Sequence, residues 1–346
     1  MSGEEERYQT AVLVLPQLRV QNANAISSPM TWGFPSITAF VGMMHALERR
    51  LKRGRGLEFL GVGVICHDFM AQATEGGYTR AFHLTRNPLI CKSGQEEAVP
   101  AAIVEEGRIH LDLTLVFLVN VAASHWAEGA RAELAQHVNR TVADMRIAGG
   151  SVLPASVGDS YRRSRPQLQL LPDDKSDRGK HFRRLRRRWV PGFALVDRTD
   201  LLHAHIAELR QDGGRSTEID AWLDLSRLNH HAERSEKVDN KTGEVSEDVA
   251  WVTEHHEGWR VPIPVGYVGL SDLYAPGSVA NTRDVTTPFR FVESVYSIGQ
   301  WVSPHRLADV NDLLWYSRYD KSTGLYRCQN DYSWVPSDMA LSSQDD

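Results

Sequence analysis

The 346-residue chain has the length of two typical domains, with 42% hydrophobic and 24% charged residues. This composition excludes wholesale disorder and collagen, and no apolar run is long enough to span a membrane. Three scattered cysteines exclude a disulfide framework and a cysteine-based metal site, and the acidic N-terminus lacks a signal-peptide pattern. We therefore expect a reduced, cytoplasmic protein without a cofactor.

The net charge of −5 conceals one concentrated basic segment. Residues 178–188 (RGKHFRRLRRR) contain seven Lys or Arg residues and no acid, which leaves 32 basic and 44 acidic residues, or −12, for the rest of the chain. A local positive region on an acidic body favours binding of a polyanion at one defined place over indiscriminate coating of nucleic acid.

The first half of the chain predicts the order strand, helix, strand, strand, helix, strand. A Val- and Leu-rich strand over 11–20, interrupted at Pro16, precedes a polar loop over 21–36, and Ser36 is expected to cap the following helix. The remaining elements are strands over 59–66 and 111–119, a helix over about 124–147 that ends at Gly149-Gly150, and an extended piece over 151–153. This is the order of the ferredoxin-like fold, in which an open sheet face can bind single-stranded RNA.

The second half predicts elements added to that core. The basic segment leads into a strand over 189–197, helices over about 199–211 and 219–229, an acidic, unstructured excursion over 230–257, extended segments over 261–270 and 289–296, and a short helix over 303–316 with Ser303 as cap and Pro304 first. The expected fold class is thus α+β, with a ferredoxin-like core in 1–155, an insertion over 156–258, a segment over 259–330 that packs back on the core, and a variable tail over 331–346.

Catalytic motifs are not evident in the sequence. It contains no phosphate-binding loop, nucleophile elbow or zinc-protease motif. The adjacent pair His67-Asp68 would point to opposite faces of a strand. The pairs His230-His231 and His255-His256 lack the spacing of a known metal site, so solvated loop residues are the better interpretation.

Arginines of the basic segment are the first binding candidates. On a helix, Arg184, Arg187 and Arg188 share a face, while Phe182, Leu185 and Trp189 can pack underneath. Guanidinium groups suit phosphate oxygens. A solvated face that balances nearby acids is the alternative, although like charges at this spacing repel one another without a partner.

Three other segments supply candidates for reading RNA bases. The polar loop contributes Asn22, Asn24, Ser27, Ser28 and Trp32, preceded by Arg19, although Asn and Ser side chains often cap their own loop instead. Arg86 and Asn87 precede a turn-setting proline. The last set is Arg146, Gly149, Gly150 and Ser151, where two glycines would allow close approach to a ligand, or simply end the helix.

Long motifs in these segments resemble one protein family. They include QNANAISSP, TWGFPS, FHLTRNPL, MRIAGGSVLP, the RRLRRR–PGFALV block, VPIPVGY and WVSPHR, in the same order from about residue 12 to 327. The family is the second Csy protein of type I-F CRISPR surveillance complexes, in the Cas-five branch of the RAMP superfamily. The acidic stretch 230–257 and the last fifteen or so residues match it poorly.

The resemblance implies a non-catalytic, RNA-binding subunit that grips the 5′ handle of the CRISPR RNA. Its implied partners are the large subunit, with which it forms a heterodimer, the terminal backbone subunit, and double-stranded DNA recognised by the whole complex. Because some relatives in the Cas-five branch cut repeat RNA, an endoribonuclease of the RAMP superfamily is the alternative. A purely structural adaptor between proteins is a third possibility.

Overall fold

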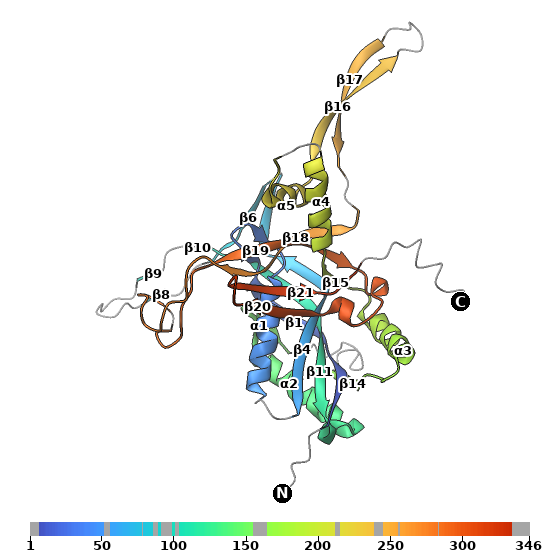
Figure 1. Ribbon diagram of the computed structural model, residues 1–346, viewed down its shortest axis with the longest axis vertical. Coiled ribbons are helices and arrows are strands. Elements are labelled where there is room, and N and C mark those ends of the chain that lie inside the picture. The colour runs from blue at the N-terminus through green and yellow to red at the C-terminus, as the bar shows by residue number, and fades with distance from the viewer. Residues whose placement is uncertain are drawn as a thin grey trace.

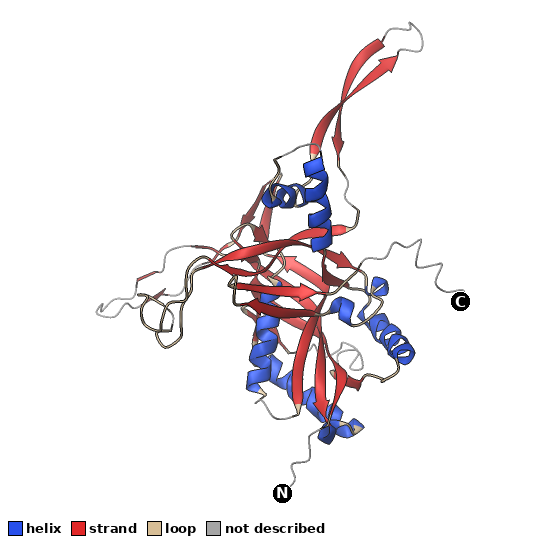
Figure 2. Cartoon of the chain, viewed as in Figure 1, coloured by secondary structure: helices blue, strands red, loops and turns tan. Residues whose placement is uncertain are grey.

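The computed structural model describes residues 7–51, 56–77, 79–85, 89–90, 99–100, 104–154, 165–211, 215–238, 245–254, 257–282 and 284–333. The fold is mixed α+β, with an antiparallel sheet of eleven strands at its centre and helices on both faces of that sheet (Figures 1 and 2). One long two-stranded ribbon extends away from this body. The arrangement agrees with the α+β class expected from the sequence.

The first part of the sheet consists of four neighbouring antiparallel strands in the order β13–β1–β11–β4. These strands are β1 (Tyr8–Asn24), β4 (Leu57–Ala71), β11 (Arg108–Ala122) and β13 (Gly150–Leu153). Helix α1 (Ile37–Arg50) connects β1 to β4, and α2 (Glu128–Ala143) follows β11. The alternation of strands and helices is therefore the one that the sequence predicted.

Strand β1 continues beyond the predicted break at Pro16. A bulge between Leu15 and Leu18 leaves Pro16 and Gln17 outside the pairing with β11, so the missing N–H of proline removes no sheet hydrogen bond. Gln17 adopts a φ of 52°, and its N–H donates to Thr114 Oγ1 at 3.3 Å. Because of the bulge, β1 continues its pairing with β11 on both sides of Pro16.

Helices α1 and α2 cover one face of these strands. Alternate β1 residues such as Leu13 and Leu15 pack in one core with Phe40 and Leu47 of α1 and Val138 of α2. The predicted cap is confirmed, because the Ser36 hydroxyl accepts the Thr38 N–H at 3.3 Å. Helix α2 ends four residues before the predicted end at Ile147.

The basic segment covers part of the opposite face. It forms α3 (Lys175–Arg186) and the 3₁₀ turn η2 (Arg187–Trp189), whose Phe182, Leu185 and Trp189 are buried against Val12 and Val14 of β1. The predicted apolar underside of this helix is confirmed. The expectation of an open sheet face is corrected, because α3 and η2 cover part of it.

The second part of the sheet closes on the first. It continues from β4 through β15 (Phe193–Asp197), β19 (Val292–Val302), β18 (Trp259–Gly269), β21 (Leu325–Asn330) and β20 (Trp315–Asp320). Trp315 of β20 pairs with Val62 of β4, so these six strands form a ring. Trp315 is fully buried, and its indole N–H donates to the carbonyl of Leu195 at 2.8 Å.

Shorter elements complete the described chain. They are the strands β2 (Ile26–Ser28), β3 (Thr31–Trp32), β5 (Ala73–Gly76), β6 (Thr79–Phe82), β7 (Leu84–Thr85), β8 (Leu89–Ile90), β9 (Val99–Pro100), β10 (Val104–Glu105), β12 (Arg146–Ile147) and β14 (Gln167–Leu170), the helices α4 (Thr199–Gln211) and α5 (Glu218–Leu225), and the turns η1 (Ala123–His125), η3 (Pro304–Arg306) and η4 (Asn311–Leu313). Helix α4 matches its predicted range, whereas α5 ends at Leu225, four residues before the predicted end. Among the described residues, no helix is long and apolar enough to cross a membrane.

Three sequence-based expectations are corrected. The acidic excursion forms paired strands β16 (His230–Val238) and β17 (Val245–Thr253), where alternating Val and Trp residues support strand pairing despite the charge. The predicted helix over 303–316 is only η3 and η4, because the Asp312 carboxylate accepts the N–H groups of Ala308 and Asp309 and ends the helical path. The polar loop contains the hairpin β2–β3.

The packing of α3 gives a stability prediction. Truncating Phe182, which is 2% exposed, to Ala removes the ring that joins α3 to the sheet, so we expect a loss of about 3–5 kcal/mol in the free energy of unfolding. Denaturant titration measures it. The adjacent exposed change Arg183→Ala is the control and should cost little. Equal effects of the two changes would contradict the observed packing.

Candidate nucleic-acid interface

A polar groove of about 590 Å³ brings several predicted residues together. It is lined by Asn24 and Ser27 of the polar loop, by Ala148 and Gly149 of the turn between β12 and β13, by the segment from Pro35 to Ala39 at the start of α1, and by Tyr267 and Tyr326. The backbone N–H of Asn24 donates to the carbonyl of Ala148 at 2.8 Å, which fixes the loop against the turn. Residues more than 120 positions apart in the chain thus form one surface.

The loop side chains make most of their hydrogen bonds within the loop. The Asn24 amide donates to the carbonyl of Ile26 at 2.7 Å and accepts the Ile26 N–H at 3.1 Å. The hydroxyls of Ser27 and Ser28 lie 2.8 and 2.6 Å from Thr31 Oγ1, and Ser28 is buried. Self-capping, the alternative named for this loop, therefore fixes its shape. Asn24 and Ser27 still line the groove, whereas Ser28 supports the hairpin from below.

Gly149 lies in a hairpin turn and Gly150 begins β13, so the two glycines do not end a helix. Ala148 and Gly149 have φ values of 48° and 79°, as in a two-residue turn that joins two antiparallel strands. A Cβ on Gly150 would lie 2.8 Å from the backbone nitrogen of Ala23, so only glycine fits there. The guanidinium of exposed Arg146 donates to the Gly149 carbonyl at 3.1 Å, and Ser151 is also exposed.

The N-terminus of α1 adds positive potential to the groove. Its first turn contains no acidic residue, so the partial positive charge of the backbone N–H groups is not neutralised there. Tyr267 and Tyr326 are directly opposite each other on β18 and β21. Burial raises the pKa of Tyr326, which keeps its phenol protonated and able to donate. Sequence reasoning missed both tyrosines because their strands are distant in the chain.

Asn22 and Arg19 lie beside the open half of the sheet. The Asn22 N–H donates to His110 Nδ1 at 3.1 Å, and its amide oxygen accepts from Gln72 at 2.7 Å. Arg19 is opposite Asp112, which in turn is opposite Asp68, in a surface depression of about 270 Å³. Two carboxylates on this face oppose a polyanion, so this half of the sheet is a poorer RNA surface than the groove.

The second candidate surface is formed by the arginines of α3 and η2. Arg184, Arg187 and Arg188 are exposed as predicted, together with Arg183. Arg188 donates to the side-chain oxygen of Gln167 at 2.5 Å. Within the part of the chain that the structure describes, the other three form no ion pair or hydrogen bond. We call these four residues the arginine surface.

Mutual repulsion within the arginine surface is evident from the neighbouring groups. Burial lowers the pKa of Arg186, and the charges of Arg183 and Arg187 lower it further. Burial likewise lowers the pKa of His181, with a second contribution from Arg184, and His181 Nε2 is buried without a hydrogen-bond partner in the described chain. An anion bound here would relieve this repulsion.

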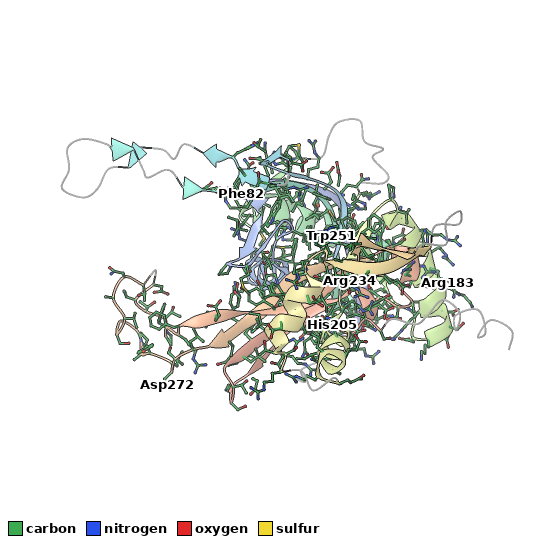
Figure 3. The ribbon with its side chains drawn as sticks, turned by 90° about the horizontal axis from the view of Figure 1, so that it is seen from above. Phe82, Arg183, His205, Arg234, Trp251 and Asp272 are labelled. Carbon is green, nitrogen blue, oxygen red and sulfur yellow. The ribbon has the colours of Figure 1, made fainter. Side chains whose placement is uncertain are left out.

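The two candidate surfaces lie on different sides of the sheet. The groove adjoins α1, which packs on the Leu13 face, whereas α3 packs on the Val12 face. In Figures 1 and 3, α3 and its Arg183 are far from β6 and its Phe82, which contacts Trp32 of the loop. The two sets of predicted residues therefore form two separate surfaces. Arg86 and Asn87 lie outside the described residues.

Two histidines of the described residues, His67 and His205, are held by side-chain hydrogen bonds. In the described part of the chain, no group of three His, Cys, Asp or Glu side chains is placed to hold a metal ion. Both ring nitrogens of His67 are engaged, with the Pro191 carbonyl at 2.6 Å and Thr114 Oγ1 at 2.7 Å. His205 lies 2.7 Å from Asp224 on the neighbouring helix, where it joins α4 to α5.

Two comparisons identify relatives. A family model described as "CRISPR-associated protein (Cas_Csy2)" matches residues 13–328. A curated protein from Pseudomonas aeruginosa (strain UCBPP-PA14), "CRISPR-associated protein Csy2", is 44% identical over 319 residues, which cover 92% of this chain and 94% of the relative. The family match therefore spans both candidate surfaces and nearly all of the sheet.

The hairpin turn gives a second prediction. Gly150→Ala should lower the free energy of unfolding by about 1–3 kcal/mol, because its Cβ meets the backbone of Ala23. Gly149→Ala is the matched control: its Cβ meets no atom within 4 Å, so only the cost of the positive φ remains, about 1–2 kcal/mol at most. Thermal unfolding compares the two. A larger loss for Gly149→Ala would argue against the close approach of β13 to β1.

Proposed function

The chain belongs to the CRISPR-associated Csy2 family, and on this basis we propose that it is a non-catalytic RNA-binding subunit of a type I-F CRISPR surveillance complex. In this proposal it holds the 5′ handle of the CRISPR RNA. The observation that carries the proposal is the polar groove, which joins two of the motifs that carry the family resemblance, QNANAISSP and MRIAGGSVLP, in one place.

The topology of the first sheet half supports a ferredoxin-like core of the RAMP type. Four antiparallel strands in the spatial order β13–β1–β11–β4, connected through α1 and α2, correspond to that fold. The fold itself carries many functions, so the argument for RNA rests on the groove. Its donors, its two tyrosines and the start of α1 suit splayed bases and a phosphate.

The arginine surface has a separate role in this proposal. Because it lies on the other side of the sheet, it binds phosphates of a polynucleotide stretch that does not occupy the groove. Guanidinium groups at this density bind any phosphate backbone, whatever its base sequence. The candidates are a more distant part of the same RNA and the double-stranded DNA target.

Protein partners have an apolar surface available. The segment between β18 and β19 exposes several large apolar side chains, namely Leu270, Leu273, Tyr274, Val285, Phe291 and Val292. Large apolar side chains exposed in one segment are typical of protein interfaces. We assign it to the large subunit of the complex, with which the chain would form a heterodimer, and the terminal backbone subunit would contact the chain elsewhere.

A test of RNA binding uses the chain co-expressed with its genomic neighbours and a repeat-containing RNA. We expect a short RNA to co-purify intact and ultraviolet light to crosslink it to peptides around the groove, including Tyr267 or Tyr326. The same RNA incubated with the pure chain, with and without divalent metal, should remain uncut. Clean cleavage would instead favour the endoribonuclease, and RNA retention without any crosslink to this chain would favour a structural adaptor.

The arginine surface gives a prediction on salt dependence. The triple variant Arg183→Ala, Arg184→Ala, Arg187→Ala removes the three arginines that lack partners in the described chain. Each phosphate contact to a single strand contributes about 0.7 to the slope of log affinity against log salt, so the slope should fall by about 2. Filter binding of the co-purifying RNA over a salt series measures this slope.

A charge-matched control for that variant is Arg140→Ala, Arg215→Ala, Lys321→Ala, which removes three exposed cations elsewhere. It should leave the slope unchanged. If both triple variants shift the slope equally, the effect is one of net charge and the arginine surface has no specific role.

A further inference from the structure

A second cavity, of about 460 Å³, adjoins the same hairpin that borders the groove. Asn24 and Ser27 at the start of the hairpin line the groove, whereas Trp32 and Gly33 at its end line this cavity. Its aromatic lining is Trp32, Phe34, Phe69, Phe193, Trp259 and Trp301, contributed by five segments distant in sequence. We call it the aromatic cavity.

Four of these rings are exposed to an unusual degree. Trp32, Phe69, Phe193 and Trp259 are 43%, 53%, 44% and 47% exposed, although side chains of this size are normally buried. Ring contacts hold them in place: Phe193 and Trp259 meet edge-to-face at 5.5 Å, and Trp259 lies 6.1 Å from Trp301, directly across the strand pair. The rim is therefore an ordered aromatic surface and not a loose loop.

The tryptophans of the aromatic cavity differ in their hydrogen bonds from three other tryptophans of the chain. Trp126, Trp222 and Trp315 each donate the indole N–H to a backbone carbonyl, as buried tryptophans usually do. Within the described residues, the three tryptophans of the aromatic cavity donate to no group. The cavity thus combines apolar faces with donors that have no acceptor in the described chain.

One cation, Arg80, and one carboxylate, Asp68, line the cavity, and the Asp68 carboxylate accepts the neighbouring Phe69 N–H at 2.9 Å. The Arg80 guanidinium lies 5.7 Å from the centre of the Trp32 ring and pairs with Glu75 at 2.8 Å. Both members of this pair are more than half exposed, so the ion pair is weak and the guanidinium can exchange to another anion. His67 lines the wall but has both nitrogens engaged.

We propose that the aromatic cavity receives one unstacked base of the RNA that the groove holds; this inference rests on the proposed function. A base supplies a flat face for the rings, acceptors for the indole N–H groups and an adjoining phosphate for Arg80. An aliphatic side chain of a protein partner would contact the rings but would supply neither acceptors for the indole N–H groups nor a phosphate for Arg80. Because a single narrow hairpin separates the cavity from the groove, one RNA strand can reach both.

The test combines a protein variant with a scan of the RNA. Synthetic copies of the RNA that co-purifies with the chain carry one abasic nucleotide at successive positions of the 5′ end. With the wild-type chain we expect one position to lose roughly 5- to 150-fold in affinity, the range for one base–aromatic stack. The Trp259→Ala variant should lose as much affinity for the unmodified RNA. It should lose no further affinity for the RNA that is abasic at that position. The slope of affinity against salt should stay constant, because no phosphate contact is removed.

Controls separate this inference from folding and from the proposed function. Trp251→Ala removes a tryptophan that is 75% exposed on the β16–β17 ribbon, which extends away from the body (Figure 1), and should have no effect, whereas Trp259→Phe should keep most of the affinity. If every abasic position is tolerated while RNA still binds, the inference is overturned and the proposed function stands. If Trp259→Ala releases a co-purifying protein with unchanged RNA affinity, the occupant is a protein side chain. Failure of the wild-type chain to bind RNA would overturn both proposals.

Discussion

The antiparallel pairing of β1 with β11 is the interaction on which the other parts of the structure depend. It presents Leu13 and Leu15 to α1 and α2 on one face, and Val12 and Val14 to the basic helix on the other. Further along, it delivers Asn24 to the turn at Ala148. Two bulges, at Pro16-Gln17 and at Gln21-Asn22, permit this without a break in the strand.

The basic helix illustrates how packing tolerates electrostatic cost. Arginines at three- and four-residue spacing repel one another, and an isolated helix of this sequence would be disfavoured. Burial of Phe182, Leu185 and Trp189 against the sheet offsets that repulsion, and Asp174 caps the first turn by accepting the Asp177 N–H at 3.0 Å. The arginines are thus held in an exposed array before any partner arrives, which reduces the ordering entropy that binding must overcome.

Local patterns in the sequence predicted local structure well and long-range arrangement poorly. The cap at Ser36, the apolar underside of α3 and the alternation of strands and helices all follow from spacing of a few residues. The arginine surface and the groove lie on different sides of the sheet because of the face on which α3 packs. No short sequence pattern specifies that face. The sequence did not indicate Tyr267, Tyr326 or Trp259, because the strands that carry them are brought to the groove and the aromatic cavity only by the ring closure. The acidic composition of 230–257 wrongly predicted an unstructured segment, whereas its described residues form the regular antiparallel pair β16–β17.

The ring formed by β4, β15, β19, β18, β21 and β20 restricts how other chains can join this protein. A sheet with an open side can be lengthened by a strand from a neighbour, which is a common route both to assembly and to aggregation. Among the described strands of the ring, β20 pairs with β4 at Trp315 and Val62. The free edges of these two strands therefore face each other at that point. At the other end of the sheet the outermost strand, β12, has only two residues. Addition of a further strand is therefore restricted at these two places, and a chain that joins there would be recognised mainly through side chains, whose identity can be selected.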